Sequence, residues 1–244
     1  MLNKNLLKQI SLLKQKKQRI IQNSFVVEGE KSILEFLESH FILKILLVTD
    51  ARLAKIFNNI ELINEDEMKK ISFLTNPSAA LAVFEIPKPK LFQESKIILA
   101  LDQINDPGNL GTIIRLCDWF GIENIICSQN TVDVYNPKVV QATMGSLTRV
   151  NVSYLDLFQF LNQTKLAIFG TFMNGSNIYQ TQLPENGIIV MGNEANGISS
   201  EIESLITKKI TIPNFSKHQK TESLNVATAT AIVFSEFCRK INIF

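Results

Sequence analysis

Residues 102–121, DQINDPGNLGTIIRLCDWFG, decide how the fold of this chain is interpreted. A continuous apolar run, IILAL at 97–101, ends directly before them, and a pattern of helical period begins within them. Aspartates, asparagines, a proline and a glycine stand between the two, and all of these residues favour turns. A buried strand, a polar turn and a helix in succession are typical of an α/β fold, in which ligands bind beyond the carboxyl ends of the strands.

The helix expected over 109–120 has one apolar side. Its apolar residues recur at i, i+3, i+4 and i+7: Leu110, Ile113, Ile114 and Cys117. Arg115 lies roughly 140° around the helix from Leu110, at about 100° per residue, so it should point away from the core. Asn109 stands where a helix cap is expected. The purely structural explanation of this stretch is a helix capped by Asn109, with a surface ion pair between Arg115 and Asp118.

Strands and helices alternate along the whole chain, which predicts an α/β fold with a mostly parallel sheet. Near the start, 2–21 has the pattern of one amphipathic helix. The alternation is interrupted by PKPK at 87–90, so we place a linker at about 86–95. We predict two domains, 1–88 and 89–244, and expect the second to fold and bind its ligand without the first.

The distribution of charge differs between the two predicted domains. Residues 1–90 carry 14 Lys and Arg against 10 Asp and Glu, a balance of +4, whereas 91–244 carry 11 against 13, a balance of −2. Within 1–19 there are six basic residues and no acidic one. Binding to a polyanion is one explanation of this asymmetry, and a solvated helix face is the other.

Several classes of protein are excluded by composition and motif. Three cysteines without CxxC spacing indicate reduced, buried thiols of a cytoplasmic protein, and two histidines argue against a zinc site or a Ser-His-Asp triad. No apolar run reaches the ~18 residues of a membrane span, and the start of the chain lacks the apolar core of a secretory signal. GxGxxG and GxxxxGK[ST] are both absent, so neither a dinucleotide fold nor a P-loop is expected.

A second strand end has an unusual composition. In VMGNEANGIS, residues 190–199, the strand stops at Gly192, and Gly197 follows five residues later with Glu194 between them. Glycines allow the backbone to approach a ligand closely. A plain turn into a helix capped by Ser199 would need neither the acidic residue nor both glycines.

A third strand end precedes the last helix. In IPNFSKHQKTESLNVATATA, residues 212–231, a polar loop leads to a helix rich in small residues. Ser223 and Asn225 stand at the helix entrance, where they could contact an anion or a hydroxyl group or simply cap the helix. The alanines and threonines would allow close packing, for instance across a subunit interface.

In this order the three motifs resemble those of the SpoU/TrmH family of RNA ribose 2′-O-methyltransferases, in the SPOUT superfamily. The matching pieces are N-x-G-x-x-x-R (Asn109, Gly111, Arg115), M-G-x-E-x-x-G (Gly192, Glu194, Gly197) and I-P…S-L-N-V (Ile212, Pro213, Ser223 to Val226). They span 97–240. The first 90 residues, most clearly FVVEGEKSI at 25–33, resemble more loosely the ribosomal-protein-like substrate-binding domain that many members carry.

The resemblance implies a trefoil-knotted α/β catalytic domain, a rare exception to the rule against knots, and a homodimer that shares its active site. S-adenosylmethionine would bind in the knot through main-chain contacts at Gly192, Ile212 and Leu224. Arg115 matches the position assigned as the base for the ribose 2′-hydroxyl. The positions that arrange the substrate and this arginine match Asn109, Glu194, Ser223 and Asn225. One departure is PNFSKHQKTE at 213–222, which is longer than the short glycine-containing loop expected in the family.

The role of Arg115 has two chemical interpretations. A free guanidinium has a pKa above ~12, so it could act as a base only where burial and nearby cations lower that pKa. Alternatively, Arg115 stabilises charge on the 2′-oxygen while a substrate phosphate or water takes the proton. The sequence does not choose between them.

We therefore expect a cytoplasmic, dimeric, S-adenosylmethionine-dependent RNA 2′-O-methyltransferase without a metal or a membrane segment. Ribosomal RNA is the first expectation for the substrate, because of the additional N-terminal domain, and transfer RNA is the second. A catalytically inactive RNA-binding protein on the same fold is the alternative from another class, and the complete set of site residues argues against it. A small-molecule α/β enzyme would leave the basic N-terminal helix unexplained.

Overall fold

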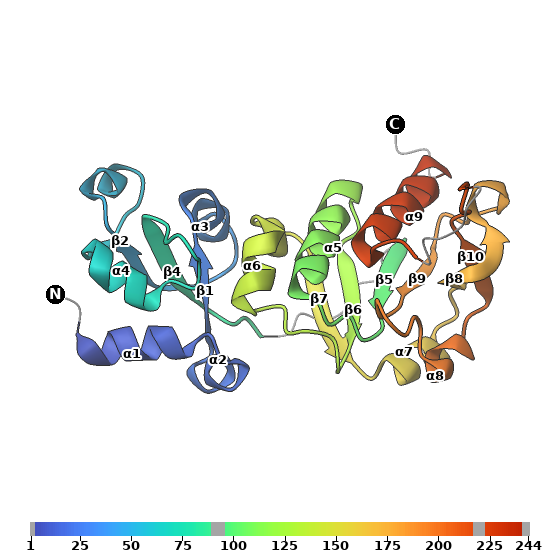
Figure 1. Ribbon diagram of the computed structural model, residues 1–244, viewed down its shortest axis with the longest axis horizontal. Helices are drawn as coiled ribbons and strands as arrows, with labels where there is room; N and C mark the ends of the chain where they lie inside the picture. Colours follow the sequence, from blue (N-terminus) through green and yellow to red (C-terminus); the bar gives the residue numbers. More distant parts are fainter. Residues whose placement is uncertain (1–2, 89–95, 217–222, 241–244) are drawn as a thin grey trace. The chain divides into compact units, whose positions relative to one another are not determined.

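The structure is a computed structural model that describes residues 3–88, 96–216 and 223–240. The chain packs into two compact units (Figure 1). The first consists of Met1–Pro89 together with Asp133–Thr148, and the second of Lys90–Val132 together with Arg149–Phe244. The predicted linker at 86–95 lies largely outside the described residues. Packing thus adds 133–148 to the N-terminal unit, a segment that the predicted division into 1–88 and 89–244 places in the C-terminal domain.

The first unit contains a four-stranded mixed sheet in the order β1-β4-β2-β3. The strands are β1 (Ser24–Glu28), β2 (Leu43–Val48), β3 (Glu61–Leu62) and β4 (Ala80–Glu85). The helices are α1 (Lys4–Leu12), α2 (Lys16–Gln22), α3 (Glu30–Leu37) and α4 (Glu65–Ile71), with a 3-10 turn η1 (Ala51–Lys55). One side of the sheet packs with α1 and α4 around a core that includes Ile10, Leu13, Val26, Leu47, Met68 and Leu81.

The single helix predicted over 2–21 is wrong, because the structure has two helices there, α1 and α2. The break between them is stabilised by Arg19, whose guanidinium donates to the carbonyls of Leu13 and Lys14 at 2.8 and 2.9 Å. Arg19 is therefore buried, whereas the apolar Ile20 beside it is 65% exposed.

Segment 133–148 supplies α6 (Pro137–Thr143) and a 3-10 turn η2 (Ser146–Thr148) to the first unit. The helix α6 packs against β1 and buries Val139 and Val140. The rings of Tyr135 and Phe25 lie 4.7 Å apart. Helix α6 ends at Thr143, because Met144 and then Gly145 have positive φ.

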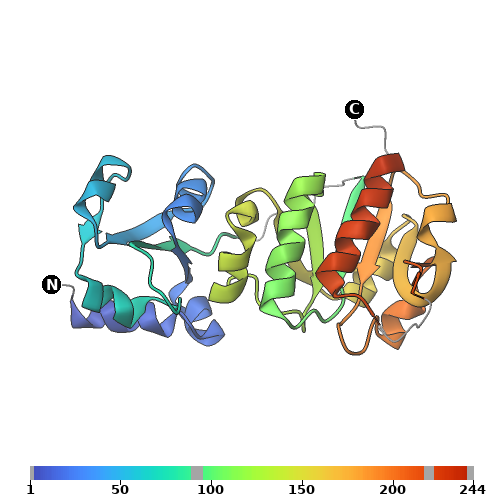
Figure 2. The same cartoon turned by 45° about the horizontal axis from the view of Figure 1, so that its top comes forward.

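The second unit is built on a parallel six-stranded sheet in the order β10-β8-β9-β5-β6-β7 (Figures 1 and 2). Its strands are β5 (Ile97–Leu101), β6 (Asn124–Ser128), β7 (Asn151–Leu155), β8 (Ile168–Asn177), β9 (Gly187–Met191) and β10 (Lys208–Thr211). Its helices are α5 (Pro107–Phe120), α7 (Leu157–Gln163), α8 (Ser200–Glu203) and α9 (Val226–Lys240), with a 3-10 turn η3 (Ile178–Gln180). The predicted α/β class and the predominance of parallel strands are confirmed.

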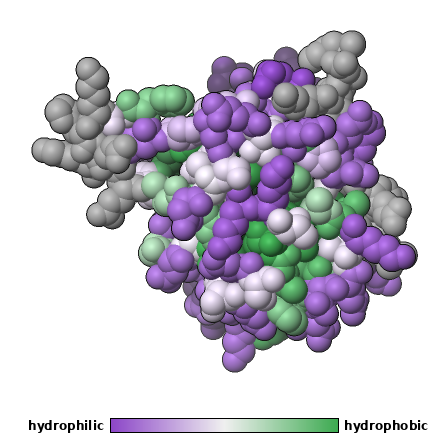
Figure 3. All heavy atoms as spheres, turned by 90° about the vertical axis from the view of Figure 1, so that its right-hand side faces the viewer, coloured by the Kyte–Doolittle hydropathy of each residue, from purple (hydrophilic) through white to green (hydrophobic). Residues whose placement is uncertain are grey.

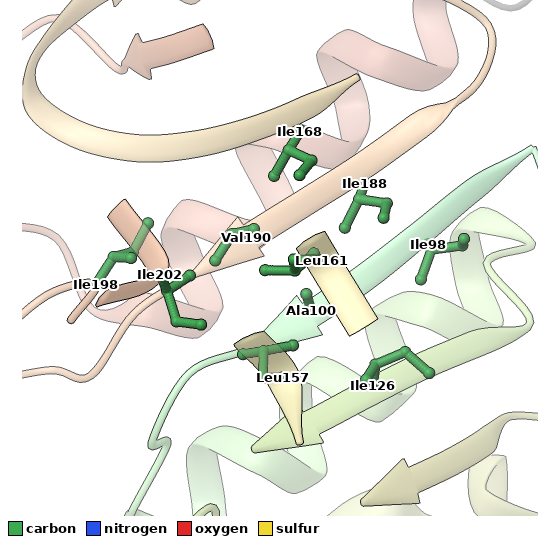
Figure 4. Packing of buried hydrophobic residues seen from close by; sticks show 10 residues of the cluster. All are labelled: Ile98, Ala100, Ile126, Leu157, Leu161, Ile168, Ile188, Val190, Ile198 and Ile202. Carbon is green, nitrogen blue, oxygen red and sulfur yellow. The ribbon is translucent and has the colours of Figure 1, made fainter. Parts of the chain in front are cut away.

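Helices cover both faces of this sheet, as the continuous apolar strands require. On one face α7 and α8 pack on the strands (Figure 4), through Ile98, Ala100, Ile126, Leu157, Leu161, Ile168, Ile188, Val190, Ile198 and Ile202. On the other face Phe237 of α9 contacts Phe169 of β8 at 5.2 Å between ring centroids. Helix α5 lies beside α9, and Phe120 contacts Phe234 at 5.8 Å.

The surface of the second unit seen in Figure 3 is mostly hydrophilic around a central apolar area. Within the ranges that the structure describes, no helix is both long and apolar enough to cross a membrane.

Deleting residues 1–88 should unprotect α6 while the parallel sheet stays protected. Val139 and Val140 are buried in the first unit. Removal of β1 exposes them, and each then loses up to about 1.5–3 kcal/mol of the stabilising free energy that burial provides. Hydrogen exchange by mass spectrometry of the deleted and full-length chains measures this difference. Equal protection of 137–143 in both proteins would contradict the packing of α6 with the first unit. This revises the expectation that the second domain folds unchanged alone.

Candidate active site

The three predicted motifs follow strands that end at one edge of the parallel sheet. Strand β5 pairs with β9, and Leu101, the last residue of β5, lies opposite Met191, the last residue of β9. Strand β10, which ends at Thr211, is parallel to β8, itself parallel to β9. The carboxyl ends of parallel strands meet at the same edge, so the loops that follow them form one candidate site.

The N-cap of α5 is Asp106, and the prediction that Asn109 caps this helix is wrong. The carboxylate of Asp106 accepts the Asn109 N–H at 2.8 Å, and Pro107 occupies the first turn. Asn109 is thus one turn inside the helix. Because the capping task belongs to Asp106, the side-chain amide of Asn109 is available for other partners.

This amide joins the other two motifs. Asn109 Nδ2 donates to Glu194 Oε1 at 2.8 Å, and Asn109 Oδ1 accepts from Asn225 Nδ2 at 2.9 Å. Asn225 Oδ1 also accepts the backbone N–H of Ala227 at 3.0 Å, so Asn225 caps α9 while it donates to Asn109. The structure therefore brings together three of the five predicted catalytic residues in one hydrogen-bonded chain. Ser223 is exposed and has no bond to this chain within the described residues.

Glu194 stands on a short loop that is held by its own backbone. Asn193 and Gly197 exchange two backbone hydrogen bonds, both of 2.9 Å. The side chain of Asn193 accepts the Ala195 N–H at 2.8 Å and donates to the carbonyl of Gln103 at 2.7 Å. The loop that carries Glu194 is thereby tied to the loop that leads to Asn109.

Gly192 is required by the close approach of another part of the chain. A Cβ at this position would lie 2.2 Å from the carbonyl carbon of Gly197 and 2.3 Å from the nitrogen of Ile198. Gly197 itself has a φ of +69°, which favours glycine. Both glycines thus have a structural role in placing Glu194, in addition to any role toward a ligand.

Sequence reasoning missed Asp102 and Gln103. Asp102 is buried, and its carboxylate accepts the N–H of Ser199 at 2.8 Å. Gln103 has a φ of +58° and its N–H donates to Ser128 Oγ at 2.9 Å. These two residues connect the loop after β5 to the loops after β9 and β6. An acidic residue after a buried strand was the available signal, but it does not identify its partner.

Arg115 lies on the polar side of α5, as predicted. The residues of the predicted apolar stripe are fully buried: Leu110, Ile113, Ile114 and Cys117. Arg115 is exposed and has no hydrogen bond or ion pair in the described part of the chain. The surface pair of Arg115 with Asp118 is not observed, because Asp118 is bound by Arg149 at 2.9 Å. Arg115 is therefore available to a ligand at this surface.

The three predicted cofactor contacts fit a ligand held by the main chain. Gly192 and Ile212 directly follow β9 and β10, and Leu224 precedes Asn225, with 48% of its surface exposed. Outside the strand ladders of the described residues, no backbone hydrogen bond engages the N–H or C=O of these three residues. Among the described residues, their main-chain polar groups are therefore available to a ligand. Part of the loop at 213–222 lies outside the described residues.

The Cys117 thiol of α5 is not suited to chemistry at this site. Burial raises the pKa of the Cys117 thiol well above its usual range, so it stays protonated and unreactive. No cluster of His, Cys, Asp and Glu that could hold a metal occurs in 3–88, 96–216 or 223–240. The polar side chains of this site are amides, the carboxylates of Asp102, Asp106 and Glu194, and the guanidinium of Arg115.

The model of the SpoU rRNA methylase family matches residues 96–235, which contain every residue of this site. The chain belongs to this family. A second model, the MRM3-like substrate binding domain, matches residues 4–82 of the first unit. The resemblance found in the motifs is thus confirmed for both parts of the chain.

Similar proteins are found among characterised and solved family members. The 23S rRNA (guanosine(2553)-2′-O)-methyltransferase RlmP of Bacillus subtilis is 30% identical over 228 residues, which cover 89% of this chain and 90% of RlmP. A putative TrmH-family RNA methyltransferase structure from Porphyromonas gingivalis has a TM-score of 0.89 and 36% identity, covering 98% of this chain and 99% of that one. The AdoMet-bound rRNA methyltransferase of Sinorhizobium meliloti has a TM-score of 0.85 and 29% identity, covering 99% and 97%.

Substituting Gly192→Ala should weaken S-adenosylmethionine binding as well as folding. The added Cβ displaces the backbone at Gly197, and overpacking of this kind costs about 1–3 kcal/mol. Thermal unfolding and calorimetric titration with the cofactor measure the two effects. The matched control is Gly121→Ala, since Gly121 has a φ of +69° but an added Cβ there would meet no atom within 4 Å. Backbone strain alone costs about 1–2 kcal/mol at Gly121, and cofactor affinity should not change.

Proposed function

We propose that this chain transfers a methyl group from S-adenosylmethionine to a ribose 2′-hydroxyl in ribosomal RNA. The observation that carries the proposal is the hydrogen-bonded chain Glu194–Asn109–Asn225 at the sheet edge, whose central residue, Asn109, lies on the same helix as the exposed Arg115. Membership of the SpoU rRNA methylase family supports the reaction, and relatives named as 23S rRNA 2′-O-methyltransferases support the substrate.

The protein has to position its reactants and stabilise charge. When bound, the cofactor supplies an activated sulfonium methyl group, and the main-chain groups of Gly192, Ile212 and Leu224 would hold it. Asn109 is fixed on both sides, so it offers a preorganised polar edge to the ribose. Positioning without reorganisation is the largest contribution that such a site can make to the rate.

Arg115 is assigned to stabilising the 2′-oxygen during attack. The exposed guanidinium of Arg115 offers a fork of N–H donors, so it suits a developing negative charge better than proton abstraction. The proton then passes to water or to a substrate phosphate. Of the two interpretations left open by the sequence, the exposure of Arg115 supports this one.

The first unit is proposed to bind the RNA. Its match to a substrate-binding domain supports this, as does the row of exposed lysines on α1 and α2: Lys4, Lys8, Lys16 and Lys17. These side chains can neutralise phosphates without a change in fold.

The assembly and location of the protein are part of the same proposal. We propose a cytoplasmic homodimer with a trefoil-knotted second unit, as is expected of the family. An exposed Trp119, with 84% of its surface accessible on α5, supports a protein partner at this helix, and the small residues that begin α9 beside it allow close packing.

Mapping of 2′-O-methyl groups in RNA from cells with and without the gene tests the proposed function. The expected result is one methylated ribose in ribosomal RNA that disappears with the gene and is restored by the purified protein and S-adenosylmethionine. If deletion of the gene removed 2′-O-methyl groups from transfer RNA alone, ribosomal RNA would not be the substrate. An unchanged methylation map would instead favour an RNA-binding protein without catalysis.

The substitution Arg115→Ala should lower the single-turnover rate of methyl transfer by about 10²–10³. Because Arg115 is exposed and outside the core, folding and cofactor affinity should remain close to those of the unsubstituted protein. Arg115→Lys should restore little of the rate, since an ammonium lacks the planar fork of donors. Arg239→Ala is the matched control, an exposed arginine about 21 Å along α9 from Asn225 at 1.5 Å per residue. A normal rate in Arg115→Ala would remove this residue from the mechanism.

RNA binding should weaken steeply as salt rises, because lysine–phosphate contacts release counterions. Replacing both Lys16 and Lys17 by glutamine should reduce the slope of log K against log salt by up to about 2. Filter binding or fluorescence anisotropy at several salt concentrations measures the slope. Lys165→Gln, an exposed lysine of the second unit, is the control. An unchanged slope in the double variant would place the phosphate contacts elsewhere.

A further inference from the structure

Segment 133–148 joins β6 to β7 in the second unit, yet it packs as part of the first. The chain therefore leaves the second unit between Val132 and Asp133 and returns to it between Thr148 and Arg149. None of the proposed catalytic or cofactor-binding residues lies in this segment. Direct contact with the cofactor or the ribose therefore does not explain why this segment packs in the first unit.

Asp133, at the start of the segment, is bound by Arg19 of the first unit. Arg19 Nη2 and Nε donate to Asp133 Oδ2 at 2.5 and 3.0 Å, while Nη1 donates to the carbonyls of Leu13 and Lys14. The Arg19 side chain is only 2% exposed. A buried guanidinium is strongly destabilising once one of its partners is lost. Asp133 is therefore fixed to the turn between α1 and α2.

Val132, the residue just before, is bound equally firmly in the second unit. Its N–H donates to the carbonyl of Ile104 at 2.8 Å, and its carbonyl accepts the hydroxyl of Tyr154 at 2.5 Å. Ile104 is fully buried in the loop that leads from β5 to Asn109. Val132 thus binds the loop before α5, and Asp133, the next residue, binds Arg19.

The return of the chain has the same arrangement. The N–H and the hydroxyl of Thr148 both donate to the carbonyl of Gly145, at 3.0 and 2.8 Å, within the first unit. The next residue, Arg149, binds Asp118 with Nε and Nη2, both at 2.9 Å. Asp118 lies in the last turn of α5, three residues after Arg115. The end of the segment is therefore attached to the helix that carries the proposed catalytic arginine.

We propose that segment 133–148 couples the first unit to α5, and that Arg19 and Asp133 are positioning residues for methyl transfer. The residues that flank the segment hold α5 at both ends, through the loop before it and through Asp118 in its last turn. A displacement of the segment with the first unit thus moves Asn109 and Arg115 relative to the loops of the sheet edge. This inference rests on the proposed function and adds that RNA binding by the first unit sets the geometry of the second.

The test uses Asp133→Asn, which keeps the shape of the side chain and removes the charge that binds Arg19. A second variant, Arg149→Gln, breaks the other attachment at a half-exposed pair, where folding is not at risk. The matched control is Asp50→Asn, which breaks the exposed Arg52 pair of the first unit. Thermal unfolding of each variant reports purely structural effects.

Single-turnover methylation of unmethylated, transcribed ribosomal RNA is measured at saturating RNA and cofactor, with the RNA dissociation constant measured separately. Both coupling variants should lower the saturated rate by about tenfold, within the 5–150-fold typical of coupling between sites, with RNA affinity nearly unchanged. The control should retain the full rate. Normal saturated rates in both variants, or a loss of RNA affinity alone, would overturn the coupling.

Hydrogen exchange in 107–120 with and without RNA separates this inference from the proposed function. RNA should change the exchange of α5 in the unsubstituted protein and not in Asp133→Asn, whether or not methyl transfer is detected. An identical response of α5 in both proteins would contradict the coupling. An unsubstituted protein whose α5 responds to RNA but which transfers no methyl group would contradict the proposed function alone.

Discussion

The site depends on one side chain, the amide of Asn109, which has a donor and an acceptor in a single rigid group. Its Nδ2 binds Glu194 and its Oδ1 binds Asn225, so loops from three distant parts of the sequence meet at one residue. An aspartate at this position could only accept hydrogen bonds, and it would repel Glu194. The constraint therefore specifies an amide, and it also requires that another residue, Asp106, cap the helix.

Hydrogen bonding and core packing have separate tasks in placing α5. Two hydrogen bonds of Asn109 contribute about 0.5–1.5 kcal/mol each, whereas each fully buried side chain of the apolar stripe contributes about 1.5–3 kcal/mol. Burial of the stripe thus decides where the helix lies. The hydrogen bonds decide how its first turn is oriented toward the neighbouring loops. This division leaves the polar side of the helix, with Arg115, available for chemistry without loss of stability.

The boundary between the two units is a second consequence of local packing. Residues 133–148 lie between two strands of the parallel sheet in the sequence, but their apolar residues are buried in the first unit. The buried Arg19 has partners on two segments that are more than a hundred residues apart, and it stabilises both. Segment 133–148 thus lies between strands of the parallel sheet in the sequence and belongs to the first unit by its packing.

The sequence by itself determined the α/β class, the strands and the apolar stripe of α5, because these follow from local periodicity. It also predicted a set of site residues, through spacing that matches a family: Asn109, Arg115, Glu194, Ser223 and Asn225. It could not show that Asp106 rather than Asn109 caps α5, since both are good caps and only backbone geometry distinguishes them. It left the basic residues of 1–19 open between polyanion binding and a solvated helix face, and it placed 133–148 in the second domain, because burial and ion pairing across 114 residues leave no local pattern. Tertiary structure decided these points, since the free energy of a buried charge depends on partners that the chain brings together only when it folds.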